Sequence, residues 1–561
     1  MPATNSAELQ LGMAHSPSHT LSEVALESVL ARSLPSAVTA PKAPSPEDTY
    51  AKFYDPEDPT THCEVKVTSS VTLEDIARVT PPEDMERLYD YAEEMKGKRI
   101  VRVNATAAGG GVAIMNSPWV HLMQELGVNA SWHALKPDPE AAEVTKGKFH
   151  NVLQNVAGEG VRLTEEDKEV YENWIAENVP LLEEPLREAA VIIIDDWQPS
   201  RLIKYIKGFE EQTEHGPVFH LGINPNAKIL FRDHIHTRAD LMGKEGTPQH
   251  TTWKYLWEDN QINKADVFIV HPKPEFVPPD VPDDKVVYMP ATCDLLDDLN
   301  RQLSEEERRK GIAFINEHLA ETDGQLPIDP DRPYIALVAR FDGSKGMPQG
   351  MESYAKARQL LLDQGVKEAD LPQFVLIGNG SIDDPDGPKL KREMLDLRAG
   401  IYADIKDDIK IVRVPHNDAA INAIVGGAKI AYQPSTAEGF ESRVTDAILQ
   451  GVPVIGSDRG GIPLQIEEGR SGYVIDPYDT DEWARRTAEL LTDEVAYAEM
   501  RRTTLELARS KNYAFTTVPN VLRWLWLSSN VKPGLQGNQC RVDELMAYME
   551  LGLEDQVFAN N

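Results

Sequence analysis

Short apolar runs alternate with longer amphipathic stretches along most of this chain, and the alternation occurs in two successive series. The first series contains KRIVRVNAT, AAVIIIDDWQPS, GPVFHLGI, KILFRDHIH, ADVFIVHP and KVVYMPAT. The second contains YIALVARF, QFVLIGNG, IKIVRVP, AKIAYQPS, VPVIGSD and SGYVIDP. Apolar strands separated by helices are typical of a parallel sheet covered by helices. The sequence therefore predicts an α/β protein with two Rossmann-like domains in tandem.

The length of 561 residues is enough for two large hydrophobic cores. Residues 1–70 are rich in Ser, Pro and Ala and lack a sustained period, so we expect a disordered N-terminal arm. The first domain is predicted to span 71–325 and the second 326–510, with the proline-rich stretch LPIDPDRP at their junction. Residues 511–561 are predicted to form helices that pack back across the domain junction.

Charge and composition exclude several classes of function. The chain has 57 basic and 91 acidic residues, a net charge of −34, which repels nucleic acid and anionic membranes. No apolar run approaches the roughly 18 residues of a membrane span, and the N-terminus lacks a signal-peptide pattern. Three widely spaced cysteines fit neither a disulfide framework nor a zinc site. We expect a cytoplasmic protein without cofactor or metal, whose anionic ligand is held by a few cations.

In a Rossmann-like domain, ligands bind at the carboxyl ends of the strands, so the residues directly after each strand are candidates. In the first domain a glycine turn follows KRIVRVNAT, and its backbone amides could approach a ligand at a helix start; a plain tight turn is the alternative. A polar group follows AAVIII, where a helix cap is the alternative to sugar binding. These candidates are Gly109, Gly110, Gly111, Asp195, Asp196 and Gln198.

Two further strand ends carry cations and histidines. The stretch FRDHIHTRADL places Arg232 and His234 just after a strand, where hydrogen bonding to a substrate is favoured over a metal because no third ligand spacing accompanies the histidines. In VARFDGSKG, Arg340 closes a strand and Lys345 follows five residues later. Two cations at one strand end suit a phosphate or pyrophosphate.

The stretch STAEGFESRVTDAIL provides the last candidates. Its apolar spacing predicts a helix that begins near Phe440, with Glu438 on the preceding loop. The amides of Gly439, Phe440 and Glu441 would then form a helix start suited to phosphate. Asp446 follows Glu438 by eight residues, which predicts that both acids lie on the same side of the segment. A sugar phosphate or nucleotide sugar would have the length and polarity to contact both.

Together these residues resemble the retaining glycosyltransferases of the GT-B fold, whose signature is Glu, seven residues, Glu, with an Arg and a Lys that hold the donor phosphate. The chain is most similar to the trehalose-forming branch, which contains fungal retaining trehalose phosphorylases and archaeal trehalose synthases. The motifs carrying this likeness include GGGVA, KGKFHNVLQN, IDDWQP, RDHIHTRADL, IGNGSIDDPDG and GGIPLQIEEGRSGYVID. The EGFE form and the tail VLRWLWLSSNVKPG look more like the phosphorylases.

The resemblance implies a cleft between two domains, with the acceptor held mainly by the first and the donor by the second. It implies that Arg340 and Lys345 bind donor phosphate, that Glu438 binds hydroxyls of the donor glucose, and that His234 lies near the reacting sugar. Asp196 and Gln198 would face the acceptor. The implied reaction is interconversion of trehalose and phosphate with α-glucose 1-phosphate and glucose.

Two alternatives stay open at this point. One is a trehalose synthase that uses a nucleoside-diphosphate glucose, which Asp446 disfavours because it is one methylene shorter than the family's second Glu. The other is a non-catalytic sugar-binding regulatory protein, which the presence of all four residues His234, Arg340, Lys345 and Glu438 disfavours. A dehydrogenase is disfavoured because the glycine turn lacks the G-x-G-x-x-G spacing. The sequence leaves a homodimer open.

Overall fold

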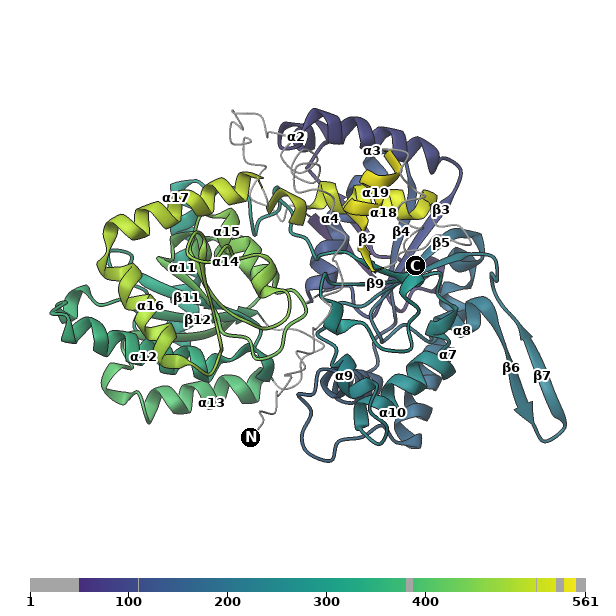
Figure 1. Ribbon diagram of the computed structural model, residues 1–561, viewed down its shortest axis with the longest axis horizontal. Helices are drawn as coiled ribbons and strands as arrows, with labels where there is room; N and C mark the ends of the chain where they lie inside the picture. The colour runs from purple at the N-terminus through teal and green to yellow at the C-terminus, as the bar shows by residue number, and fades with distance from the viewer. Residues whose placement is uncertain (1–49, 109, 380–386, 511, 531–538, 551–561) are drawn as a thin grey trace, which may run out of the picture.

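Two parallel sheets with helices packed on them form the body of the protein (Figure 1). The computed structural model describes residues 50–108, 110–379, 387–510, 512–530 and 539–550. Every strand pair within the two large sheets is parallel. The predicted α/β fold with two Rossmann-like domains is thereby confirmed.

The first domain contains a seven-stranded sheet in the order β17-β10-β9-β8-β5-β3-β4. Its core strand β5 reads AAVIIID and is buried nearly throughout, because apolar clusters lie on both faces of the sheet. The strands are β3 (Arg99–Asn104), β4 (Asn129–Ala134), β5 (Ala189–Asp195), β8 (Lys228–Arg232), β9 (Val267–Val270), β10 (Val286–Tyr288) and β17 (Cys540–Arg541).

The helices of the first domain include two π-helical segments, η2 (Thr145–His150) and η3 (Tyr255–Asp259). The α-helices before η2 are α2 (Leu73–Arg78), α3 (Pro82–Glu94), α4 (Gly111–Glu125) and α5 (Pro139–Val144). Those after it are α6 (Asn151–Leu153), α7 (Glu165–Glu188), α8 (Leu202–Lys207), α9 (Ala239–Met242) and α10 (Pro248–Lys254).

The second domain contains a six-stranded sheet in the order β13-β12-β11-β14-β15-β16. All six apolar runs predicted for this domain form its strands: β11 (Tyr334–Val338), β12 (Gln373–Asn379), β13 (Ile409–Val414), β14 (Ile430–Gln433), β15 (Val454–Ser457) and β16 (Gly472–Ile475). Its helices are α11 (Glu305–Glu321), α12 (Met347–Asp363), α13 (Gly387–Ala399), α14 (Asp418–Gly427), α15 (Ser442–Leu449), α16 (Thr480–Thr492) and α17 (Glu494–Ser510). Strands β11 and β14 are neighbours, which brings the loops that follow them together.

The chain returns from the second domain to the first near its C-terminal end (Figure 1). Helix α18 (Thr517–Asn530) packs on α3 and α4, and its apolar side chains belong to the core of the first domain. Strand β17 then pairs with β10 at the edge of the first sheet, and α19 (Val542–Glu550) follows. The sequence predicted the helices of this segment but not the strand, which is two residues long.

The run GPVFHLGI was predicted as a strand of the parallel sheet, and this prediction is wrong. Strand β7 (Gly216–Leu221) pairs antiparallel with β6 (Gly208–Thr213) in a separate ribbon that projects from the first domain (Figure 1). A connection of two residues between the strands favours such a hairpin. The apolar side chains of β7 are exposed, 71% for Phe219 and 96% for Leu221, so the run contributes little to the core.

The predicted disorder of residues 1–70 does not hold where the structure describes them. Strands β1 (Tyr50–Phe53) and β2 (Lys66–Ser69) pair antiparallel. Val65 and Val71 lie in the core of the first domain, and their burial stabilises the segment. Residues 1–49 lie outside the described residues. Among the helices that the structure describes, none has the length and apolar character to cross a membrane.

Candidate active site

Two loops at the carboxyl ends of β11 and β14 form the centre of the candidate site. The first loop contains Arg340 and Lys345, and the second contains Glu438 and Glu441. The loops are joined by a hydrogen bond of 2.7 Å from the amide of Thr436 to the carbonyl of Ser344. Because β11 and β14 are adjacent in the sheet, residues nearly one hundred positions apart in sequence come into contact here.

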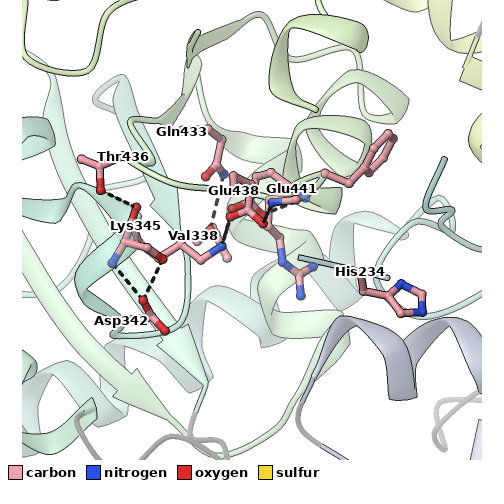
Figure 2. A network of polar contacts seen from close by, with 12 residues as sticks. His234, Val338, Asp342, Lys345, Gln433, Thr436, Glu438 and Glu441 are labelled. Carbon is pink, nitrogen blue, oxygen red and sulfur yellow. Dashed lines mark hydrogen bonds and ion pairs between the residues drawn. The ribbon is translucent and has the colours of Figure 1, made fainter. Parts of the chain in front are cut away.

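Lys345 lies between two carboxylates (Figure 2). Its Nζ donates to Glu438 Oε2 and, at 2.6 Å, to Glu441 Oε2. The side chains are 12%, 17% and 5% exposed, respectively. Burial and the neighbouring Glu441 raise the pKa of Glu438 to about 7, although Lys345 opposes the shift. Burial acts to raise the pKa of Glu441 as well, but Lys345 lowers it below its usual value, and Arg443 adds to this effect. Glu441 is therefore ionised at neutral pH, whereas Glu438 can hold a proton.

Glu441 is the partner that the sequence analysis did not identify as an acid. Only its backbone amide was assigned a role, whereas its carboxylate contacts Lys345. The helix begins two residues later than expected: α15 starts at Ser442, and Glu441 caps it in a left-handed conformation with a φ of 66°. The i, i+3 spacing of the acids in EGFE was the signal that could have identified the pair.

Asp446 lies apart from this cluster. It is 3% exposed and forms an ion pair of 2.6 Å with Arg443 on the same helix. Cys293, from the segment that connects the two domains, lies beside it, and burial raises the pKa of the Asp446 carboxyl. Since Glu438 is on the loop rather than on the helix, a spacing of eight residues does not place both acids on one helical face.

Arg340 is half-buried at the end of β11, beside Asp342. Asp342 pairs with Lys146 of the first domain, with Nζ and Oδ2 3.0 Å apart. Burial acts to raise the pKa of Asp342, but Lys146 and then Arg340 hold it well below its usual range. The loop after β11 thus carries an ionised carboxylate between cations from both domains.

The first domain contributes a buried network at the ends of β5 and β8. Asp195 receives two hydrogen bonds from Arg102, at 2.5 and 2.9 Å, and contacts His234 Nε2 at 2.9 Å. Burial lowers the pKa of His234 to about 4, so its ring is neutral at neutral pH. In Figure 2 the His234 ring points away from the Lys345 cluster. Asp195 and Arg102 hold the ring in this orientation.

The other candidates of the first domain surround this network. Asp196 has a left-handed φ of 71°, and burial raises the pKa of its carboxyl well above the usual range. Arg232 is 1% exposed and donates to His271 Nδ1 at 3.2 Å, and burial lowers its pKa to about 9. The Gln198 Oε1 atom is buried, and the described residues offer it no hydrogen-bond partner. These groups lie at the carboxyl edge of the first sheet, where the sequence placed them.

The two domains meet at the glycine that follows Glu438. A Cβ added to Gly439 would lie 2.2 Å from the carbonyl oxygen of His234, so only glycine fits this approach. The Phe440 ring stacks on His271 with centroids 5.5 Å apart. Phe440 therefore packs across the junction. Of the glycine turn, Gly110 caps α4 and Gly111 begins it, whereas Gly109 lies outside the described residues.

The site contains several polar side chains that the sequence analysis left unassigned, namely Arg102, Lys146 and Asp342. Arg102 is 1% exposed and lies between Val101 and Val103 in the middle of β3, and a charge inside such an apolar stretch is a signal for a buried ion pair. Within the described part of the chain, no group of three or more His, Cys, Asp or Glu residues could hold a metal ion.

Two facing Rossmann-like domains, with an acidic and cationic loop pair on the second, define the GT-B class of glycosyltransferases. Solved structures agree with this fold. The UDP-forming α,α-trehalose-phosphate synthase of Burkholderia xenovorans in complex with glucose-6-phosphate superposes with a TM-score of 0.56 at 15% identity, covering 76% of this chain and 100% of that one. The structure of trehalose-6-phosphate from E. coli bound with UDP-2-fluoro glucose superposes with a TM-score of 0.54 at 14% identity, covering 76% of this chain and 99% of that one.

Sequence comparisons place the chain more narrowly. Residues 102–278 match the model of the trehalose synthase N-terminal domain, and residues 320–510 match glycosyl transferases group 1. A trehalose synthase of Pyrococcus horikoshii is 31% identical over 444 residues, covering 79% of this chain and 93% of that protein. The chain belongs to the glycosyltransferase family that contains these trehalose synthases.

A trehalose phosphorylase of Grifola frondosa is 38% identical over 446 residues, covering 78% of this chain. That alignment covers 58% of the Grifola protein, so the chain spans less than two thirds of the length of this relative.

Proposed function

We propose that the protein catalyses retaining glucosyl transfer between trehalose and phosphate, giving α-glucose 1-phosphate and glucose, in either direction. The carrying observation is the position of Lys345 between two carboxylates at the carboxyl edge of the second sheet, with Arg340 on the same loop. A phosphate and a sugar are the ligands that such a mixed group of cations and acids can bind together. Similarity to proteins named trehalose phosphorylase and trehalose synthase supports the sugar.

In this proposal Arg340 and Lys345 bind the phosphate. In the direction that forms trehalose, the bond between the anomeric carbon and the phosphate of α-glucose 1-phosphate breaks, and the two cations stabilise the negative charge that develops on the departing phosphate. Glu438 binds hydroxyls of the glucose that is transferred. Because its pKa is raised to about 7, Glu438 can hold a proton near neutral pH, which lowers repulsion of an incoming phosphate dianion. In the same direction the departing phosphate accepts the proton of the glucose hydroxyl that attacks the anomeric carbon from the same face, so the anomeric configuration is retained. In phosphorolysis the phosphate attacks the anomeric carbon and gives its proton to the departing glucose oxygen.

The environment of Asp446 favours phosphate over a nucleotide as the donor group. An acid that contacts the ribose of a nucleotide has to present its carboxylate to the ligand. Asp446 is instead buried against Arg443 and Cys293. A trehalose synthase that uses a nucleoside-diphosphate glucose is the second candidate, because relatives with that name align with most of their length.

Incubation of the purified protein with trehalose and phosphate tests the proposal, with an assay for α-glucose 1-phosphate. UDP-glucose or ADP-glucose with glucose is run in parallel. Arg340→Ala and Glu438→Ala should each abolish product formation while the far-ultraviolet circular dichroism stays unchanged. Trehalose formed only in the nucleotide reaction would favour the synthase, and the absence of product in all reactions would favour a non-catalytic sugar-binding protein.

We further infer a cytoplasmic location and a homodimer for the protein. In the described part of the chain Cys63, Cys293 and Cys540 form no disulfide, as expected of a protein in a reducing compartment. Fractionation of cells and light scattering of the purified chain test the two inferences separately. Recovery in a secreted fraction, or a molar mass near 62.5 kDa in solution, would contradict them.

A further inference from the structure

Lys146 extends from the first domain toward the loop that follows β11. It lies in the π-helical segment η2, and π-helical turns are frequent at functional sites. Its Nζ is 3.0 Å from Asp342 Oδ2, with side chains 18% and 12% exposed. The partners lie 196 positions apart in sequence and on different domains. This ion pair thus joins the two domains beside the candidate phosphate site.

Asp342 also organises the loop after β11, which carries Lys345. Its second oxygen, Oδ1, accepts hydrogen bonds from the Ser344 amide at 2.8 Å and from the Ser344 hydroxyl at 2.7 Å. These bonds cap the short helix Gly343–Lys345, which carries Lys345. The Ser344 carbonyl in turn accepts the amide of Thr436, on the loop that leads to Glu438. One oxygen of Asp342 therefore contacts the first domain, and the other organises the loop.

We propose that Lys146 is a positioning residue for phosphate binding, which acts through Asp342 as a clasp between the domains. With the clasp formed, the two domains stay closed and the loop holds Lys345 and Arg340 in the geometry that binds phosphate. The proposal rests on the proposed function for its phosphate readout. Its structural readout, domain closure, is independent of any reaction.

The segment η2 offers a matched control. Lys148 lies two residues from Lys146, but it pairs with Asp167 at 3.5 Å within the first domain. Replacement by Met keeps most of the aliphatic stem and removes the charge in both variants. Lys146→Met should raise the KM for phosphate about tenfold in trehalose phosphorolysis, with kcat changed less than threefold. Lys148→Met should leave both constants within twofold of the unmodified protein.

A double-mutant cycle separates a clasp from a direct contact between Lys146 and phosphate. Asp342→Asn keeps the size of the side chain and an acceptor for Ser344. If Lys146 acts through Asp342, the two single variants should have similar KM values for phosphate, and the double variant should be no worse than either. Multiplicative effects in the double variant would overturn the proposal, because Lys146 would then contribute without Asp342.

Small-angle X-ray scattering of the ligand-free variants provides the readout that needs no activity. Lys146→Met and Asp342→Asn should each increase the radius of gyration, whereas Lys148→Met should not. An unchanged radius in the first two variants would overturn the clasp even if their KM values rose. If the unmodified protein does not phosphorolyse trehalose, the proposed function fails, and the scattering comparison still decides whether the clasp exists.

Discussion

Replacement of Lys345 by Met should destabilise the protein strongly at pH 8 and much less at pH 5.5. The change removes the cation that Glu438 and Glu441 share while both carboxylates stay buried. Removal of one partner from a buried ion pair costs about 3 kcal/mol or more. At about 2 to 4 °C for each kcal/mol in a protein of this domain size, the melting temperature should fall by about 6 to 12 °C at pH 8.

The pH dependence follows from the direction of the pKa shifts. With Lys345 present, the pKa of Glu438 is raised and that of Glu441 is lowered. Without Lys345, burial acts unopposed by this cation, so we expect both pKa values to rise and to lie above the unfolded value of roughly 4.3. The folded protein then binds more protons than the unfolded chain, so its stability falls as the pH rises through the folded-state pKa values. Below that range the acids are neutral, and most of the loss should disappear.

Differential scanning fluorimetry of the Lys345→Met variant and the unmodified protein between pH 5.5 and 8 measures this difference. A second variant, Lys345→Met with Glu441→Gln, removes one of the two carboxylates and should recover at least half of the loss at pH 8. An equal fall in melting temperature at both pH values, or no recovery in the double variant, would refute the inference that buried ionised carboxylates cause the destabilisation.

Three further changes test other parts of the site. Glu438→Gln should lower turnover about a hundredfold with little change in melting temperature, because Glu441 still neutralises the lysine; a large fall in melting temperature would contradict this. Gly439→Ala should lower kcat/KM at least tenfold, since a Cβ there would lie 2.2 Å from a backbone oxygen of the other domain, whereas Gly147→Ala, with nothing within 4 Å, should not. Asp195→Asn should lower the stability measured by urea unfolding by about 3 kcal/mol, because a buried arginine loses its charged partner; a loss below 1 kcal/mol would show that the pair adds little.

The strands of both sheets were predictable where apolar residues form an uninterrupted run. VIII in β5 and IALV in β11 are examples, since a strand covered on both faces needs apolar side chains in every position. The same reasoning failed for GPVFHL, because an exposed hairpin can carry apolar residues without burying them. The two residues of β17 give no periodic signal, and only the edge of the first sheet determines their conformation.

The sequence predicted which strand ends carry the residues of the site, but it did not predict which of these residues form ion pairs. Arg340, Lys345 and Glu438 were found because charged residues directly after apolar strands lie at the ligand-binding edge. The contact of Lys345 with the Glu441 carboxylate was not predicted, because the sequence analysis placed Glu441 in the helix start and assigned a role only to its amide. Lys146 could not be found, because its partner comes from the other domain and sequence spacing carries no information about that contact.

The return of the chain to the first domain sets an order for folding during synthesis. A ribosome finishes residues 71–300 long before it produces α18 and β17. Until these two elements are made, the first domain exposes the apolar surface that α18 covers and the sheet edge that β17 pairs with. Exposed surfaces of this kind bind chaperones and promote aggregation. The six-stranded sheet and the helices of the second domain lie within residues 305–510, so they can assemble as soon as that segment emerges. We therefore expect the N-terminal half of the chain, although made first, to reach its native state last.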